Sequence, residues 1–259
     1  MRILVTNDDG INAPGLAVAE EIAASVAEGG EVWVVAPAFE QSGVGHRISY
    51  THPTMISRFG ERRWAAEGSP ADCVLAAIHH VMDAPPDLIL SGVNRGNNSA
   101  ENTVYSGTVG AAMEGALQGI PAIALSQYLG PDNFHEPDPF ESSRLHGAET
   151  VRRILSAVPA AEGAYGLFHN VNFPPVPAAA VKGVRAVAQG YRGHGRFRVK
   201  HTEAPSGRDF LWISGSAQQD GSGEDTDATA NLDGYVSVTP MTCDLTARTA
   251  LAAMRDALG

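Results

Sequence analysis

The sequence predicts an α/β protein in which helices cover both faces of a mostly parallel sheet, followed by a more irregular, β-rich part. Two short apolar runs, residues 2–6 and 32–36, flank a segment whose apolar residues have helical spacing. Strands that are apolar on both faces and joined by a helix are typical of a parallel sheet covered on both sides. We therefore expect a Rossmann-like, three-layer α/β/α core over residues 1–130. Residues 131–259 should add the rest of the core, a β-hairpin or oligomerisation extension and a closing helix.

The elements of the first half alternate between strand and helix. Leu16, Val18 and Ile22 have helical spacing, which predicts a helix over residues 14–28 that a glycine pair ends. The other elements expected in this half are antiparallel excursions over 46–67 with their clearest strand at 63–67, a helix over 71–82, a strand over 87–91, a helix over 108–118 and a strand over 122–125.

The second half contains fewer regular elements. After a proline-rich linker at 131–139, we expect a helix over 140–157, a strand over 168–173, short strands with glycine turns over 181–216, an exposed polar loop over 218–233 and a closing helix over 245–258. Ligands of open α/β sheets bind beyond the carboxyl ends of the strands. The loops that follow three strands of the first half therefore form the expected site, namely residues 7–15, 38–45 and 92–107.

Composition excludes several classes of protein. The formal net charge is −11, with 29 acidic against 18 basic residues and no run of Lys or Arg, which argues against a partner such as duplex nucleic acid. The two cysteines, Cys73 and Cys243, form no paired pattern, which fits a reducing compartment, and Cys73 is expected in the core. No signal peptide or membrane-spanning run is recognisable. We expect a soluble cytoplasmic protein with no membrane partner.

An acidic pair, Asp8-Asp9, directly follows the first strand. Adjacent carboxylates repel each other unless a cation offsets their charge, and hard divalent ions such as Mg²⁺ or Mn²⁺ prefer oxygen ligands. Ser42 and Asn94 follow two neighbouring strands and could supply two further oxygens. The alternative is that Asp8, Asp9 and Gly10 form only a turn and a helix cap. The metal site is favoured because a second polar loop is expected at the same edge of the sheet.

A small-residue turn, Tyr105-Ser106-Gly107-Thr108, opens a predicted helix. Free N–H groups and the positive end of the helix dipole favour an anion such as phosphate, and Ser106 and Thr108 add hydroxyl donors. An ordinary Ser/Thr cap explains the turn equally well when it is taken alone. The asparagines of residues 92–98 also have two explanations, turn chemistry or contacts with metal and substrate.

Histidine and nucleophile motifs add no competing site. The nine histidines form no cluster typical of a metal site, and His46, after the Ser42 loop, is better explained by a surface or core position than by a contact with substrate. No Gly-x-Ser-x-Gly elbow and no Walker-type Gly-Lys-Ser/Thr sequence is present.

Several linked motifs, in order over nearly the whole chain, resemble the SurE family, the stationary-phase survival proteins that act as metal-dependent 5'/3'-nucleotidases. The motifs are Thr6-Asn7-Asp8-Asp9-Gly10, Gln41-Ser42-Gly43, Gly68-Ser69-Pro70-Ala71-Asp72-Cys73, Ser91-Gly92-Val93-Asn94-Arg95-Gly96, Tyr105-Ser106-Gly107-Thr108-Val109 and Gly234-Tyr235-Val236-Ser237-Val238-Thr239-Pro240. The chain departs from the family at Ser99-Ala100-Glu101-Asn102, where Leu-Gly followed by acidic residues is common, and at Ser69, where Thr is usual. These departures concern substrate preference more than chemistry.

The resemblance implies a complete set of site residues and partners. It implies that one divalent ion per subunit, Mg²⁺ or Mn²⁺, is held by Asp8, Asp9, Ser42 and Asn94. It also implies that Asn98, Ser106, Gly107 and Thr108 line the phosphate site. The implied substrates are nucleoside 5'- and 3'-monophosphates, and some members also cleave short polyphosphate. The implied assembly is a homodimer or homotetramer in which the C-terminal region is exchanged between subunits.

The expected mechanism is direct attack by an activated water, with Asp9 or Asp8 as the catalytic base. One rival is a phosphoaspartate phosphatase with Asp8 as the nucleophile, but such enzymes use two aspartates separated by one residue. A broader phosphomonoesterase or exopolyphosphatase is another rival. The alternative outside enzymology is a receiver-like signalling module, which needs a phosphoacceptor Asp at the end of a later strand. Residues 36–38 and 126–127, which follow such strands, contain no Asp.

Overall fold

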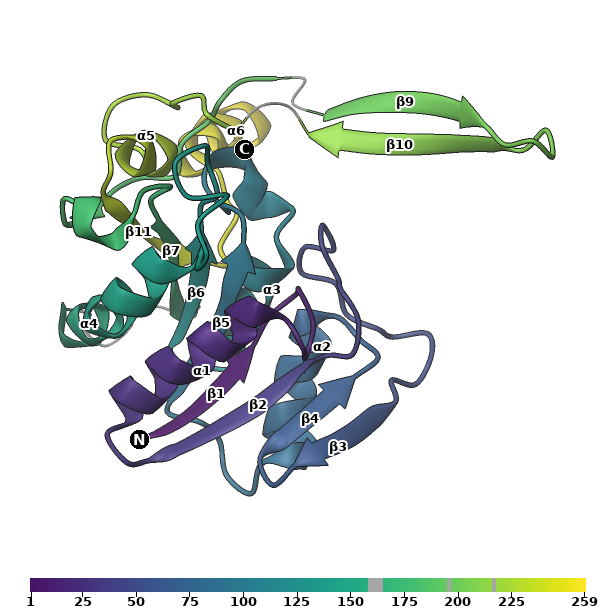
Figure 1. The fold of residues 1–259 in the computed structure, drawn as a ribbon. Helices are drawn as coiled ribbons and strands as arrows, with labels where there is room; N and C mark the ends of the chain where they lie inside the picture. The colour runs from purple at the N-terminus through teal and green to yellow at the C-terminus, as the bar shows by residue number, and fades with distance from the viewer. Residues whose placement is uncertain (158–164, 195–196, 216–217) are drawn as a thin grey trace.

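The computed structural model describes residues 1–157, 165–194, 197–215 and 218–259. Within these ranges, nine strands form one sheet in the order β3-β4-β2-β1-β5-β6-β7-β11-β8 (Figure 1). The central strands β4, β2, β1, β5, β6 and β7 run parallel, while β3 and β11 are antiparallel to their neighbours β4 and β7. Their bounds are β1 Arg2–Thr6, β2 Glu31–Pro37, β3 Ile56–Gly60, β4 Arg63–Ala66, β5 Leu88–Arg95, β6 Ala122–Gln127, β7 Leu167–Phe173, β8 Val184–Ala186 and β11 Val236–Thr242.

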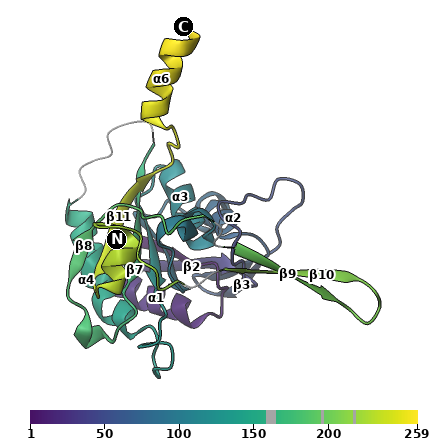
Figure 2. The same cartoon turned by 90° about the horizontal axis from the view of Figure 1, so that it is seen from above.

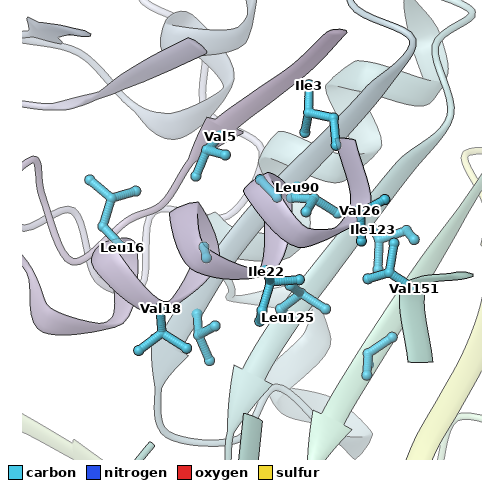
Figure 3. Close-up of a cluster of buried hydrophobic side chains, with 14 of the residues drawn as sticks. Ile3, Val5, Leu16, Val18, Ile22, Val26, Leu90, Ile123, Leu125 and Val151 are labelled. Carbon is cyan, nitrogen blue, oxygen red and sulfur yellow. The ribbon is translucent and has the colours of Figure 1, made fainter. Parts of the chain in front are cut away.

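Helices cover both faces of this sheet, which confirms the three-layer α/β/α prediction (Figure 1). The helices α1 Pro14–Ala27 and α4 Glu141–Ala157 pack on one face, and α2 Pro70–Ala76 and α3 Gly107–Leu117 pack on the other. Side chains alternate between the faces of a strand. Ile3 and Val5 therefore join the core under α1 and α4 (Figure 3), whereas Leu4 joins the core under α2 and α3. None of the helices in the described ranges has the length and apolarity needed to span a bilayer.

Most expected strands and helices are confirmed, but four differ from the sequence prediction. The helix expected over 71–82 ends as α2 at Ala76 and continues as a π-helical turn, Ala77–Val81. The antiparallel strands expected within 46–67 are present as β3 and β4, but residues 46–55 contain no strand. The strand expected at 87–91 continues to Arg95, with a register shift against β6 between Ser91 and Asn94, because Gly92 and Val93 remain buried in the sheet. Part of the loop expected at 92–107 is therefore strand.

The fourth difference lies in the segment 218–233, where the predicted exposed loop is confirmed over residues 219–225, apart from the half-buried Ser222, but was wrong for residues 227–232. The helix α5 Asp227–Leu232 lies within it, and Asp227, Ala228 and Asn231 are fully buried. Its polar side chains misled the prediction because they bond to buried backbone: Asn231 Nδ2 donates to the carbonyl of Asn172 at 2.8 Å.

Two elements project from the body of the molecule. The strands β9 Phe197–Glu203 and β10 Asp209–Gly215 form an antiparallel hairpin, and every residue of these two strands is exposed (Figure 1). The helix α6 Arg248–Leu258 extends away from the sheet and has no buried residue (Figure 2). The short strands expected over 181–216 are thus β8, β9 and β10, while residues 195–196 and 216 of that range lie outside the described residues.

Candidate functional site

Residues from four segments meet at the carboxyl edge of the parallel sheet. Asp8 follows β1, Ser42 lies in the loop after β2, Asn94 lies near the end of β5, and Ser106 caps the start of α3. The loops are tied together, because the backbone N–H of Gln41 donates to the carbonyl of Asp8 at 2.7 Å. A pocket of about 180 Å³ opens there, lined by Asp8, Ser42, Gly43, Asn94, Arg95, Asn97, Asn98, Asn102, Tyr105, Ser106 and Phe197.

The turn after β1 is built by Asn7 and Gly10, not by the carboxylates between them. Asn7 Nδ2 donates to the carbonyl of Gly10 at 3.0 Å, and the N–H of Gly10 donates to Asn7 Oδ1 at 3.2 Å. Gly10 has a φ of +101°, a backbone conformation that favours glycine. The cap of α1 is Ala13, which has no capping side-chain bond. Asp8 and Asp9 are thus required by neither turn nor cap, which leaves their carboxylates available for chemistry.

Asp8 is almost completely buried, with 4% of its surface exposed. Burial raises the pKa of its carboxyl to about 6, although the bond from Thr108 opposes the rise; the nearby charge of Asp9 adds to it. Thr108 Oγ1 donates to Asp8 Oδ1 at 2.6 Å. A Cβ on Gly107 would lie 2.9 Å from the Cβ of Asp8, so a glycine allows the start of α3 to approach the carboxylate this closely.

Asp9 lies beside Asp8 at the junction with β5. The backbone N–H of Arg95 donates to Asp9 Oδ2 at 3.0 Å. Burial raises the pKa of Asp9, and the bond from the Arg95 backbone opposes this rise. Two neighbouring carboxylates with raised pKa values are an arrangement that a bound cation would stabilise.

The remaining two oxygen donors are neutral. Ser42 Oγ donates to Glu40 Oε1 at 2.8 Å, which leaves its lone pairs for another partner. Asn94 Nδ2 donates to the carbonyl of Gly96 at 3.0 Å, which leaves the side-chain oxygen as an acceptor. Within the described ranges no three His, Cys, Asp or Glu side chains gather as a metal site, so an ion here would need neutral oxygens beside the two carboxylates. The donor set suits a hard divalent ion.

The expected phosphate residues occupy two different positions. Ser106 lines the pocket and also caps α3, because its Oγ accepts from the N–H of Val109 at 3.1 Å. The cap explanation of this turn is therefore confirmed, whereas a contact between Ser106 and phosphate stays a prediction. Gly107 and Thr108 lie behind Asp8, and the fully buried Thr108 hydroxyl is used by that carboxylate. A contact between Thr108 and phosphate stays a prediction.

Asn98 is held by a buried polar network from the neighbouring strands. Its backbone N–H donates to Asn172 Oδ1 at 2.7 Å, and Asn170 Nδ2 donates to its carbonyl at 2.8 Å. Its side chain donates from Nδ2 to Ser126 Oγ at 2.8 Å. Buried networks of this kind fix the position of their members, so Asn98 is presented rigidly to the pocket.

Sequence reasoning missed Arg192. Its side chain is fully buried and donates to Asn97 Oδ1 at 3.0 Å and to Ser99 Oγ at 2.8 Å. It also forms an ion pair with Glu101 at 3.2 Å, and so it holds the loop that lines one side of the pocket. No sequence signal marked this role, because Arg192 lies more than 90 positions from these partners.

His46 lies outside the lining of the pocket. Its Nε2 lies 2.7 Å from Oε2 of Glu114 on α3, which holds the loop after Ser42 against that helix. This fits the expected surface or core role. Cys73 is fully buried, which confirms its predicted place in the core.

Comparison with known proteins gives consistent similarities. Residues 3–196 match the family described as "Survival protein SurE". The chain is 66% identical to the "5'-nucleotidase SurE" of Ruegeria pomeroyi and 66% identical to that of Jannaschia sp., in each case over the full length of both chains. Among solved structures, the SurE protein from Aquifex aeolicus matches all of this chain with all of its own, at 34% identity and a TM-score of 0.81.

Proposed function

The chain belongs to the Survival protein SurE family, and on that premise we propose that it is a 5'-nucleotidase that releases phosphate from nucleoside monophosphates. The observation that carries the proposal is the meeting of Asp8, Ser42, Asn94, Asn98 and Ser106 at one small pocket on the carboxyl edge of the sheet. Activity on nucleoside 3'-monophosphates and a cytoplasmic location are further parts of this proposal.

We propose that one divalent ion, Mg²⁺ or Mn²⁺, is held by the oxygens of Asp8, Asp9, Ser42 and Asn94. The fit rests on two adjacent carboxylates with raised pKa values and two neutral oxygens at the same edge. When bound, such an ion would polarise the phosphoryl group and make water more acidic.

The side chains and backbone of this chain would accept the proton of the water and bind the phosphate group. Asp9 or Asp8 would accept the proton of the attacking water. Ser106, with the start of α3 behind it, would donate to the phosphoryl oxygens, on which charge develops. Asn98 would hold the phosphate group in position from its rigid network.

We also propose that the protein forms a homodimer or homotetramer. The projecting hairpin exposes large apolar side chains that a single chain leaves in water, among them Leu211, Trp212 and Ile213. An exposed apolar patch of this kind marks a surface for association. Gel filtration of the purified protein would give one peak of two or four chains; a monomer at micromolar concentration would contradict the proposal.

A substrate panel tests the proposed activity. Phosphate release would be measured on AMP, GMP and 3'-AMP with Mn²⁺, with Mg²⁺ and with excess EDTA. We expect release from the nucleotides only with an ion. Equal or faster release from simple phosphomonoesters or tripolyphosphate would indicate the broader phosphatase instead, and no release under any condition would overturn the proposal.

A further inference from the structure

A second and larger pocket adjoins the proposed phosphate site. It has a volume of about 850 Å³ and shares Ser42 and Arg95 with the smaller pocket, while Asp9 lies in its wall beside Asp8. The first turn of α1 and the segment 129–140 form its other side. A molecule with its phosphate in the small pocket could therefore extend past the acidic pair into the larger one.

The walls of the larger pocket suit a flat and largely apolar group. Leu129, Phe134, Pro137, Pro139 and Phe140 contribute apolar surface. The ring of Phe134 is about half exposed, and the guanidinium of Arg95 lies over it at 6.0 Å from the ring centroid. Any nucleobase can stack on an aromatic ring or on an arginine guanidinium group, because every base has a flat aromatic face.

The charges in the larger pocket argue against a second anion. Three carboxylates, those of Asp9, Glu40 and Asp138, face it together with two guanidinium groups. The Arg144 guanidinium is already paired with Asp138 at 2.9 Å. A polyphosphate chain would meet an excess of negative charge here, whereas the hydroxyl groups of a ribose can donate to carboxylates.

We propose that the larger pocket binds the nucleoside of the substrate, with the base stacked on Phe134 and Arg95. This inference rests on the proposed nucleotidase function and adds its substrate subsite. A second aromatic pair, Tyr105 and Phe197, borders the smaller pocket with ring centroids 4.9 Å apart. The 180 Å³ beside these rings is much less than the larger pocket offers, so we place the base on Phe134.

The test compares AMP with ribose 5-phosphate, which has the same sugar and phosphate but no base. In Phe134→Ala we expect kcat/KM for AMP to fall about tenfold, while kcat/KM for ribose 5-phosphate stays unchanged. Phe134→Trp should keep the preference for AMP, since it keeps a stacking surface. The matched control is Phe59→Ala, an exposed phenylalanine of β3 at the far edge of the sheet, which should change neither value.

Three results would overturn the assignment. They are an unchanged AMP preference in Phe134→Ala, an equal loss on both substrates, and a selective loss of AMP activity in Tyr105→Ala but not in Phe134→Ala. Titration calorimetry of adenosine binding to the ion-free protein separates this inference from the proposed function, because it needs neither the ion nor phosphate release. Binding that Phe134→Ala weakens supports the subsite even if no phosphate is released, whereas absent binding or binding that Phe134→Ala leaves unchanged contradicts it.

Discussion

Replacing Arg192 by methionine would remove a buried positive charge and keep an unbranched apolar stem. Within the described ranges the guanidinium donates to Asn97 Oδ1, Ser99 Oγ and the carbonyls of Ser99 and Asp220, and it pairs with Glu101. Methionine can make none of these bonds. The variant would leave buried acceptors in the loop at 97–101 without this donor.

The expected loss is large because the environment is dry. The Arg192 side chain is fully buried and that of Glu101 is 13% exposed, so water cannot replace the missing bonds fully. Removing one partner of a buried ion pair costs roughly 3–5 kcal/mol. The methionine stem recovers part of this by packing, so we expect the free energy of unfolding to fall by about 3 kcal/mol.

Urea denaturation followed by circular dichroism measures this change as a lower midpoint at constant slope. Arg192→Lys is the matched control: it keeps the charge but not the planar fork, so its loss should be intermediate. We also expect kcat/KM for AMP to fall about tenfold in the methionine variant, because Asn97 and Asn102 line the pocket. A loss of stability below about 1 kcal/mol would refute the structural role given to Arg192.

Three further predictions concern single residues. Gly107→Ala should lower kcat for AMP at least about tenfold, because the new Cβ would lie 2.9 Å from the Cβ of Asp8 and must displace it. Phosphate release at saturating Mn²⁺ measures kcat. An unchanged kcat would contradict the close approach of Gly107 to Asp8. Burial raises the pKa of Asp72, but hydrogen bonds from two serines outweigh it and hold the pKa below its usual range. The carboxylate therefore stabilises the fold above about pH 4, and this contribution is lost as the pH falls through the folded-state pKa; the stability difference between wild type and Asp72→Asn should shrink in urea titrations below that pH, and a difference that grows would be evidence against it. Ala100→Gly should raise the unfolding free energy by up to about 1 kcal/mol, because Ala100 has a φ of +53°; a lower thermal midpoint would argue against strain there.

The parallel core was predictable from local pattern alone. Continuous apolar strands and helical spacing locate β1, α1 and β2, since each depends on residues that are close in sequence. The position of the acidic pair was also predictable, because residues that follow neighbouring parallel strands meet at one edge of the sheet. That rule also brought Ser42 and Asn94 to the same place.

The features that sequence reasoning missed depend on partners distant in the chain. Arg192 and Asp227 look like solvated charges until the fold buries them. Asp227 accepts from the N–H of Ala100 and of Gly190, so it ties its helix to two segments that are distant in the chain. Similarly, β5 continues through Gly92 because β6 lies beside it: a Cβ on Gly92 would come within 2.2 Å of the carbonyl of Leu125. Periodicity carries no information on such contacts.

The proposed function depends on the carboxylates after β1, which would hold the ion that phosphate release requires. The most direct measurement is Mn²⁺ binding by calorimetry together with Mn²⁺-dependent phosphate release from AMP, for wild type and Asp9→Asn. Loss of a supporting residue alone costs about 10–100-fold in metal affinity or activity. We therefore predict that Asp9→Asn, although folded, loses at least about 100-fold in both. An Asp9→Asn protein with wild-type Mn²⁺ affinity and full Mn²⁺-dependent activity would show that Asp9 is not a ligand of that ion.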